Sequence, residues 1–180
     1  MDTVIEQIVK REKNIKITIT KVLIILILLL IPLAFYGISI LTSSPYFVIV
    51  GLFVFIFGIY LAWYFITSLE IEYEYCVTNN DLTIDKIIAK RKRKLIARLD
   101  IKNIEQFDKL SNMDLDSIKI KKYFFAADSD NSDSIYGCVF TSKKYGKSLL
   151  TFSPNDKILN GMKLFLKKEI VLKVFYNRSK

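Results

Sequence analysis

Residues 22–41, VLIILILLLIPLAFYGISIL, and residues 46–66, YFVIVGLFVFIFGIYLAWYFI, decide the fold of this 180-residue chain. Both lie within a run of 48 residues, 22–69, that contains no Asp, Glu, Lys or Arg. A helix rises about 1.5 Å per residue, so each stretch is long enough to cross the roughly 30 Å hydrocarbon core of a bilayer. Only Thr42–Pro45 separates them. The sequence therefore predicts an antiparallel transmembrane hairpin over residues 20–66.

The charges on either side of this hairpin predict its orientation. The loop between the two stretches is uncharged, whereas basic residues precede the first stretch and follow the second. Basic flanks are retained in the cytoplasm. We therefore expect a multi-pass protein of the cell membrane with both its N-terminus and its C-terminus in the cytoplasm.

Small residues indicate where the second helix makes close contact. Gly51, Gly58 and Ala62 fall roughly on one face, and Gly58 and Ala62 have the small-xxx-small spacing that favours helix packing. Two alternatives follow. This face meets the first helix inside the hairpin, or it forms a homodimer interface.

Residues 1–19 form a short amphipathic and basic segment before the hairpin. Thr3 and Glu6 have the spacing of a capping box, and apolar residues recur on one helical face of residues 4–9. One hypothesis is a short helix lying among the inner headgroups. The alternative is an extended tail whose charges only set the topology.

Residues 67–180 read as a separate cytoplasmic domain built mainly of strands. Apolar residues alternate with glutamates from Leu69 to Val77, and Asn79-Asn80 is typical of a tight turn. Further strands are expected over residues 82–89, 95–99, 118–126, 135–142 and 148–153. Asn155 or Asp156 then begins a helix over 155–169 that has an apolar stripe, whereas 171–176 fits either helix or strand. The predicted fold class is α+β: a small antiparallel barrel or sheet, capped by one amphipathic helix, behind a membrane hairpin.

The composition argues against several classes of function. The chain has no histidine, no phosphate-binding glycine loop and only two cysteines, Cys76 and Cys138, which we expect to be free thiols in the cytoplasm. Asp128–Asp133 resembles a calcium loop but lacks its turn glycine, and Val139 occupies the position of its bidentate glutamate. We expect no catalytic residues, no metal site and no cofactor.

One basic cluster is the best candidate binding site. Seven cations and no anion occur between residues 86 and 98. Near an anionic leaflet each cation contributes about 1 kcal/mol of attraction. The alternative is a charged turn that keeps the strand edges soluble. The candidate lipid-binding residues are Lys86, Lys90, Arg91, Lys92, Arg93, Lys94 and Arg98.

The order of elements and two sequence blocks carry a resemblance. Strands followed by one amphipathic helix, behind a two-helix anchor, resemble bacterial membrane proteins with a pleckstrin-homology-like domain. The start MDTVIEQIV at residues 1–9 and the run IEYEYCVTNNDLTIDKIIAKRKRK at residues 71–94 are similar to a family of unassigned function from low-GC Gram-positive, Clostridia-type bacteria. The resemblance covers essentially the whole chain. It implies the topology and fold, and it brings no catalytic residues.

These observations favour a membrane-anchored, non-enzymatic binding or scaffold module at the inner face of the cytoplasmic membrane. Its partners would be a protein or anionic lipid headgroups, in addition to the lipids that surround the hairpin. The net charge of +9 suits either nucleic acid or an anionic membrane surface. Because the hairpin already holds the domain at a membrane, nucleic acid is not expected as a partner. The alternative is a structural or regulatory subunit of an envelope membrane complex that acts through its hairpin.

Overall fold

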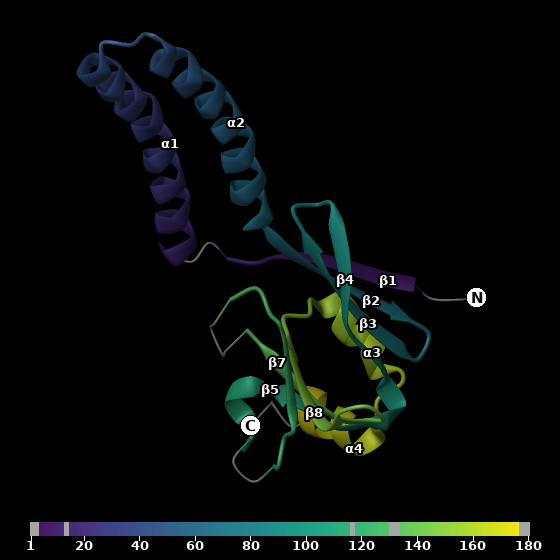
Figure 1. Ribbon diagram of the computed structural model, residues 1–180. Coiled ribbons are helices and arrows are strands. Elements are labelled where there is room, and N and C mark those ends of the chain that lie inside the picture. Colours follow the sequence, from purple (N-terminus) through teal and green to yellow (C-terminus); the bar gives the residue numbers. More distant parts are fainter. Residues whose placement is uncertain (1–3, 13–14, 116–117, 130–133, 177–180) are drawn as a thin grey trace. The chain divides into compact units, whose positions relative to one another are not determined.

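The computed structural model describes residues 4–12, 15–115, 118–129 and 134–176. The chain divides into two compact units (Figure 1): residues 13–70 form one, and residues 1–12 together with 71–180 form the other. The connection Asp128–Asp133, considered above as a calcium loop, lies partly outside the described residues. Each unit is described by itself below.

The first unit is the helical hairpin. Helix α1 spans Ile15–Thr42 and helix α2 spans Tyr46–Ser68, and both are long and apolar enough to cross a membrane. The helices extend beyond the predicted 22–41 and 46–66, because the polar residues at their ends continue the helical hydrogen bonding. The turn between them is closed by Ser39, whose hydroxyl donates to the Ser44 carbonyl over 2.8 Å.

The second unit contains two four-stranded sheets. The first sheet has the order β1-β2-β3-β4, and every neighbouring pair is antiparallel. Its strands are β1 Val4–Lys10, β2 Ile71–Thr78, β3 Asp81–Ile88 and β4 Lys92–Asp100. The Asn79-Asn80 turn joins β2 to β3 as predicted, with Asn79 at a positive φ of 53°.

Strand β1 excludes the short helix that was one of two alternatives for the N-terminal segment. Val4–Lys10 pairs along its whole length with β2, from Val4 opposite Thr78 to Lys10 opposite Glu72. The segment fits a strand because Ile5, Gln7 and Val9 alternate with residues that are exposed. Residues 1–12 therefore belong to the domain that the sequence placed at 67–180.

The second sheet has the order β5-β7-β8-β6. Its strands are β5 Ile104–Lys109, β6 Lys122–Ala126, β7 Tyr136–Ser142 and β8 Gly146–Phe152. Strand β6 runs parallel to β8, whereas the other pairs are antiparallel. The described strands form two sheets rather than the closed barrel considered above, and the α+β class with a mainly antiparallel sheet is confirmed.

Aromatic and aliphatic side chains from both sheets form one core. Tyr75, Ile84 and Phe152 are fully buried, and the Tyr75 hydroxyl donates to the Ala126 carbonyl over 2.5 Å. Desolvation by this burial raises the pKa of Tyr75 well above its usual range. The Tyr75 hydroxyl thus ties β2 of the first sheet to the end of β6 in the second.

The C-terminal helix covers this core in shorter pieces than predicted. Helix α3 spans Asp156–Lys163 and is capped by Asn155, whose side chain accepts from the Ile158 amide over 3.0 Å. A turn follows, and then come helix α4, Lys168–Val171, and a π-helical turn, Leu172–Tyr176. The predicted helix 155–169 is therefore interrupted, and the ambiguous residues 171–176 are helical. Leu166, Ile170 and Val174 of these segments are buried in the core.

Candidate functional site

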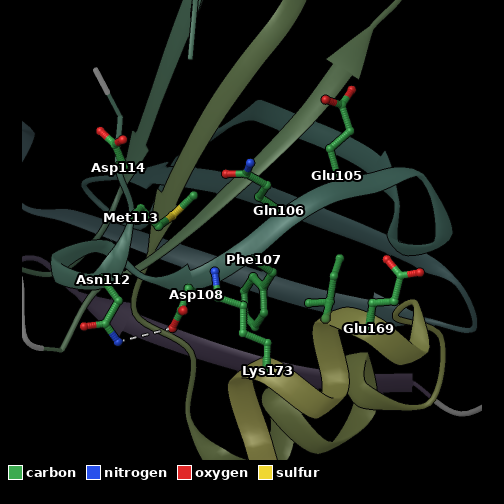
Figure 2. Close-up of a pocket in the computed structure, with 10 residues that line it drawn as sticks. Glu105, Gln106, Phe107, Asp108, Asn112, Met113, Asp114, Glu169 and Lys173 are labelled. Carbon is green, nitrogen blue, oxygen red and sulfur yellow. Dashed lines mark hydrogen bonds between the residues drawn. The ribbon is translucent and has the colours of Figure 1, made fainter. Parts of the chain in front are cut away.

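A pocket of about 340 Å³ lies between the edge strand β5 and the C-terminal helical segments (Figure 2). Phe107 of β5 forms part of its wall and stacks on Tyr136, with ring centroids 5.3 Å apart. Strand β5 was not predicted, because its apolar residues Ile104 and Phe107 are three positions apart and a register shift between Ile104 and Gln106 interrupts the alternation. The described residues that line the pocket are Glu105, Gln106, Phe107, Asp108, Asn112, Met113, Asp114, Glu169, Ile170 and Lys173.

Carboxylates dominate the charge of this pocket. Asp108 is buried, and its carboxylate accepts from the Lys109 amide over 2.7 Å and from the Asn112 side chain over 3.4 Å. The Thr141 hydroxyl donates to Glu105 over 2.6 Å and, with Lys147, holds the pKa of Glu105 below its usual range. Hydrogen bonds from protein groups thus hold the carboxylates of Asp108 and Glu105 in place, and both carboxylates contribute negative charge to the pocket.

The chemistry of the pocket is limited by its lining. The described lining residues supply carboxylates, amides and one lysine, and none of them supplies a hydroxyl or a thiol. Among the described residues, no group of three or more His, Cys, Asp or Glu is arranged to hold a metal ion. The pocket is suited to holding a cationic or amide-bearing group.

The predicted basic cluster lies on the β3–β4 hairpin. Its turn is formed by Ala89, Lys90 and Arg91, and Ala89 and Lys90 both have positive φ angles, 54° and 55°. Lys90, Lys92 and Lys94 are exposed. The structure therefore brings the seven residues onto one hairpin, although it does not place them on one face.

Arg93 and Arg98 of the cluster are paired with carboxylates. Arg93 contacts Glu74 at 2.9 Å, and Arg98 contacts Asp81 at 2.8 Å. Lys86 and Lys90 do not oppose the glutamates of β2, because Glu72 lies opposite Ile87 and Glu74 lies opposite Asp85. Lys86 instead lies opposite Tyr73 of β2 and opposite Lys94 of β4, on the same face of the sheet. Desolvation, followed by the charges of Arg11 and Lys94, lowers the pKa of Lys86.

The small residues of α2 lie against α1 within the hairpin. Gly51 and Ala62 are buried, and a Cβ atom added at Gly51 would lie 2.5 Å from the Phe35 Cβ. A Cβ added at Gly58 would lie 2.8 Å from the Leu28 Cδ1. These contacts correspond to the first of the two alternatives, packing inside the hairpin.

Comparison with known proteins gives one match. A family model described as "Bacterial PH-like domain (DUF6106)" matches residues 1–172. The match spans β1, both helices of the hairpin and the two sheets. The chain matches no curated protein and no solved structure.

Proposed function

Because the chain belongs to the bacterial PH-like domain family, we propose that it is a membrane-anchored binding module that acts without catalysis and holds anionic lipid at its β3–β4 hairpin. The two apolar helices support the anchor. In this proposal both termini lie in the cytoplasm, because basic residues flank the hairpin on both sides and its turn is uncharged.

The observation that carries the lipid proposal is the position of the basic turn along the chain. Ile88, the last residue before this turn, pairs with Ile71, the first residue of β2. Only Leu69 and Glu70 separate Ile71 from the end of α2 at Ser68. Because the basic turn is paired through the ladder with the residues that directly follow α2, we propose that its exposed lysines contact the headgroups.

The energy of such a contact is sufficient to orient the domain. Lys90, Lys92 and Lys94 are exposed, and no ion pair within the described residues engages them. At about 1 kcal/mol for each lysine near an anionic leaflet, three of them contribute about 3 kcal/mol.

The absence of catalysis in this proposal is supported by the side chains available. The free thiol Cys138 is buried, and the β3–β4 hairpin supplies no nucleophile–base pair.

The test uses the full chain in lipid nanodiscs. An environment-sensitive fluorophore is attached to a cysteine at Arg91→Cys, in a Cys76→Ser background that leaves only the buried Cys138. We expect quenching by headgroup-labelled lipids in nanodiscs that contain phosphatidylserine, and little quenching in purely zwitterionic nanodiscs.

Charge reversal then assigns the contact. Lys90→Glu, Lys92→Glu and Lys94→Glu together should abolish the quenching, whereas the matched reversal of the exposed Lys102, Lys157 and Lys168 should preserve it. Equal quenching in both kinds of nanodisc, or equal effects of the two reversals, would overturn the lipid proposal.

A further inference from the structure

A second basic surface lies where the β7–β8 turn meets the segment before β6. The two segments are held side by side: the Lys121 amide donates to the Lys147 carbonyl over 2.9 Å, and the Lys121 side chain passes 3.3 Å from the position of a Cβ on Gly146. Lysines about twenty residues apart in the chain therefore become neighbours. We call this the basic–aromatic surface; it comprises Lys119, Lys121, Lys122, Tyr123, Phe125, Lys143, Lys144 and Tyr145.

No acidic residue balances these lysines locally. Residues 118–127 and 134–155 contain neither Asp nor Glu. The ammonium groups of Lys122 and Lys144 lie 5.8 Å and 5.2 Å from the centroid of the Tyr145 ring, so two cations converge on one aromatic side chain. By contrast, Lys147 is paired with Glu105 at 3.2 Å. Within the described residues the five lysines of the surface have no carboxylate within 4.0 Å, and an external anion would relieve their repulsion.

The surface lies at the end of β6 that is remote from the hairpin connection. Strand β6 begins at Lys122 and runs toward Asp128, whose carbonyl accepts from the Glu12 amide over 2.7 Å. Glu12 is the last residue of the domain before the chain enters the hairpin unit. At about 3.3 Å per residue, β6 alone places roughly 13 Å between Lys122 and that end.

Exposed aromatic rings indicate the chemistry of a partner. Tyr123 is 63% exposed, Phe125 is 43% exposed, and both belong to the edge strand β6. Aromatic side chains are enriched in protein interfaces, and an extended segment commonly binds along the edge of a sheet. Lysines beside such rings complement a protein segment that carries both carboxylates and apolar side chains.

We propose that the basic–aromatic surface docks an acidic, extended segment of a soluble protein along β6. Carboxylates of the segment contact Lys121, Lys122 and Lys144, and its apolar side chains cover Tyr123 and Phe125. This inference goes beyond the lipid contact at the β3–β4 hairpin and stands if that contact fails.

The test measures binding of a fluorescent peptide of alternating Glu and Leu to the full chain in zwitterionic nanodiscs. The Lys121→Glu, Lys122→Glu and Lys144→Glu variant should bind about tenfold more weakly, since three exposed ion pairs contribute about 1.4 kcal/mol together. The matched variant Lys90→Glu, Lys92→Glu and Lys94→Glu should bind within about twofold of the parent, a difference of about 0.4 kcal/mol. Its three lysines lie on the β3–β4 hairpin, outside the basic–aromatic surface. A peptide of Gln and Leu should bind weakly to all three proteins.

Two further measurements separate this proposal from its competitors. Hydrogen exchange should slow in residues 119–125 when the Glu-Leu peptide is added, and Tyr123→Ser with Phe125→Ser should weaken binding without altering thermal stability. Equal losses in the two charge-reversed variants would overturn the proposal. Tighter binding of a single-stranded oligonucleotide of equal charge would overturn it in favour of nucleic acid, and recruitment of phosphatidylserine vesicles to this surface would overturn it in favour of lipid.

Discussion

Ala89 is one of two adjacent residues with a positive φ in the β3–β4 turn. Its φ of 54° lies in the left-handed region, where a residue with a Cβ is disfavoured by about 1–2 kcal/mol. Ala89→Gly removes this strain but adds freedom to the unfolded chain, so we expect a net gain of about 0.5 kcal/mol in the free energy of unfolding. Thermal unfolding in detergent measures it.

Gly146 provides the matched control for Ala89. Its φ is 71°, and an added Cβ would contact the Lys121 side chain at 3.3 Å. Gly146→Ala should therefore lower stability by about 1 kcal/mol. A loss of stability in Ala89→Gly would contradict the assignment of strain to the basic turn.

Lys86 is expected to give a pH-dependent contribution to stability. Desolvation, with the charges of Arg11 and Lys94, lowers its pKa in the folded domain. The unfolded chain then binds the proton more tightly, so stability is reduced at neutral pH and rises as the pH increases from the folded pKa toward the unfolded one. Lys86→Met should raise the melting temperature at pH 7 and remove the alkaline rise. Lys157→Met, on an exposed site, should do neither.

The contacts of individual side chains could be predicted only in part from the sequence. The seven cations of residues 86–98 were visible in composition, and they do lie on one hairpin. Their partners were not predictable, because one bulge at Ile84 and Asp85 decides which cation faces which carboxylate. Likewise, the basic–aromatic surface depends on a tertiary contact between Lys121 and Gly146 that no local pattern encodes.

At the scale of elements, strand β1 is joined to the rest of the domain by Gln7. Its side chain donates to the Ser153 carbonyl over 3.1 Å and accepts from the Asn155 amide over 2.8 Å. Gln7→Leu would leave both backbone groups without this partner, and we expect a loss of about 2 kcal/mol in the free energy of unfolding. Glu6→Gln, on the exposed face of the same strand, should have little effect. Equal melting temperatures for the two variants would contradict this role.

The hairpin offers a second test at this scale. Gly51→Leu should destabilise the packing of α1 on α2, because the added side chain meets Phe35 from its Cβ outward. Gly37→Leu is the matched control, since nothing lies within 4 Å of a Cβ at Gly37. Resistance of the hairpin to unfolding in denaturing detergent should fall for the first variant alone. A loss in both would mean that helix length or hydropathy, rather than this contact, sets the resistance.

Predictability differed among the elements for physical reasons. The two helices and strands β2, β3, β7 and β8 follow from strong periodicity, and the structure contains them. The apolar residues of Val4–Lys10 recur at a helical spacing, but pairing along β2 makes the segment a strand. The helix predicted over 155–169 is interrupted between Lys163 and Lys168, and no local pattern in the sequence signals this turn.

At the scale of the whole molecule, the hairpin is an insertion into the domain. Strand β1 precedes it and β2 follows it, yet the two strands are neighbours in one sheet. The sequence predicted the two apolar spans, although α1 and α2 extend beyond them. It could not show that residues 1–12 return to the domain, because strand pairing across 60 or so residues depends on tertiary packing that leaves no local periodicity.

This insertion predicts how a soluble form of the domain can be made. The Arg11 amide donates to the Ile71 carbonyl over 3.1 Å, and Lys10 pairs with Glu72, so the two ends of the insertion are already adjacent. Replacing residues 13–70 with a short Asn-Gly turn should convert β1 and β2 into an ordinary β-hairpin. We expect this protein to be monodisperse without detergent and to unfold cooperatively.

A fragment of residues 71–180 alone is the control, and it should behave differently. Without β1 it exposes the edge of β2 and removes Ile5, which lies against Gly161 of α3. Unpaired strand edges associate with one another, so the fragment should aggregate in size-exclusion chromatography where the joined protein elutes as a monomer. If both proteins aggregate, the domain requires the hairpin itself for folding. If both are monomeric and equally stable, β1 contributes nothing to the sheet, and the pairing on which the discontinuous domain depends is wrong.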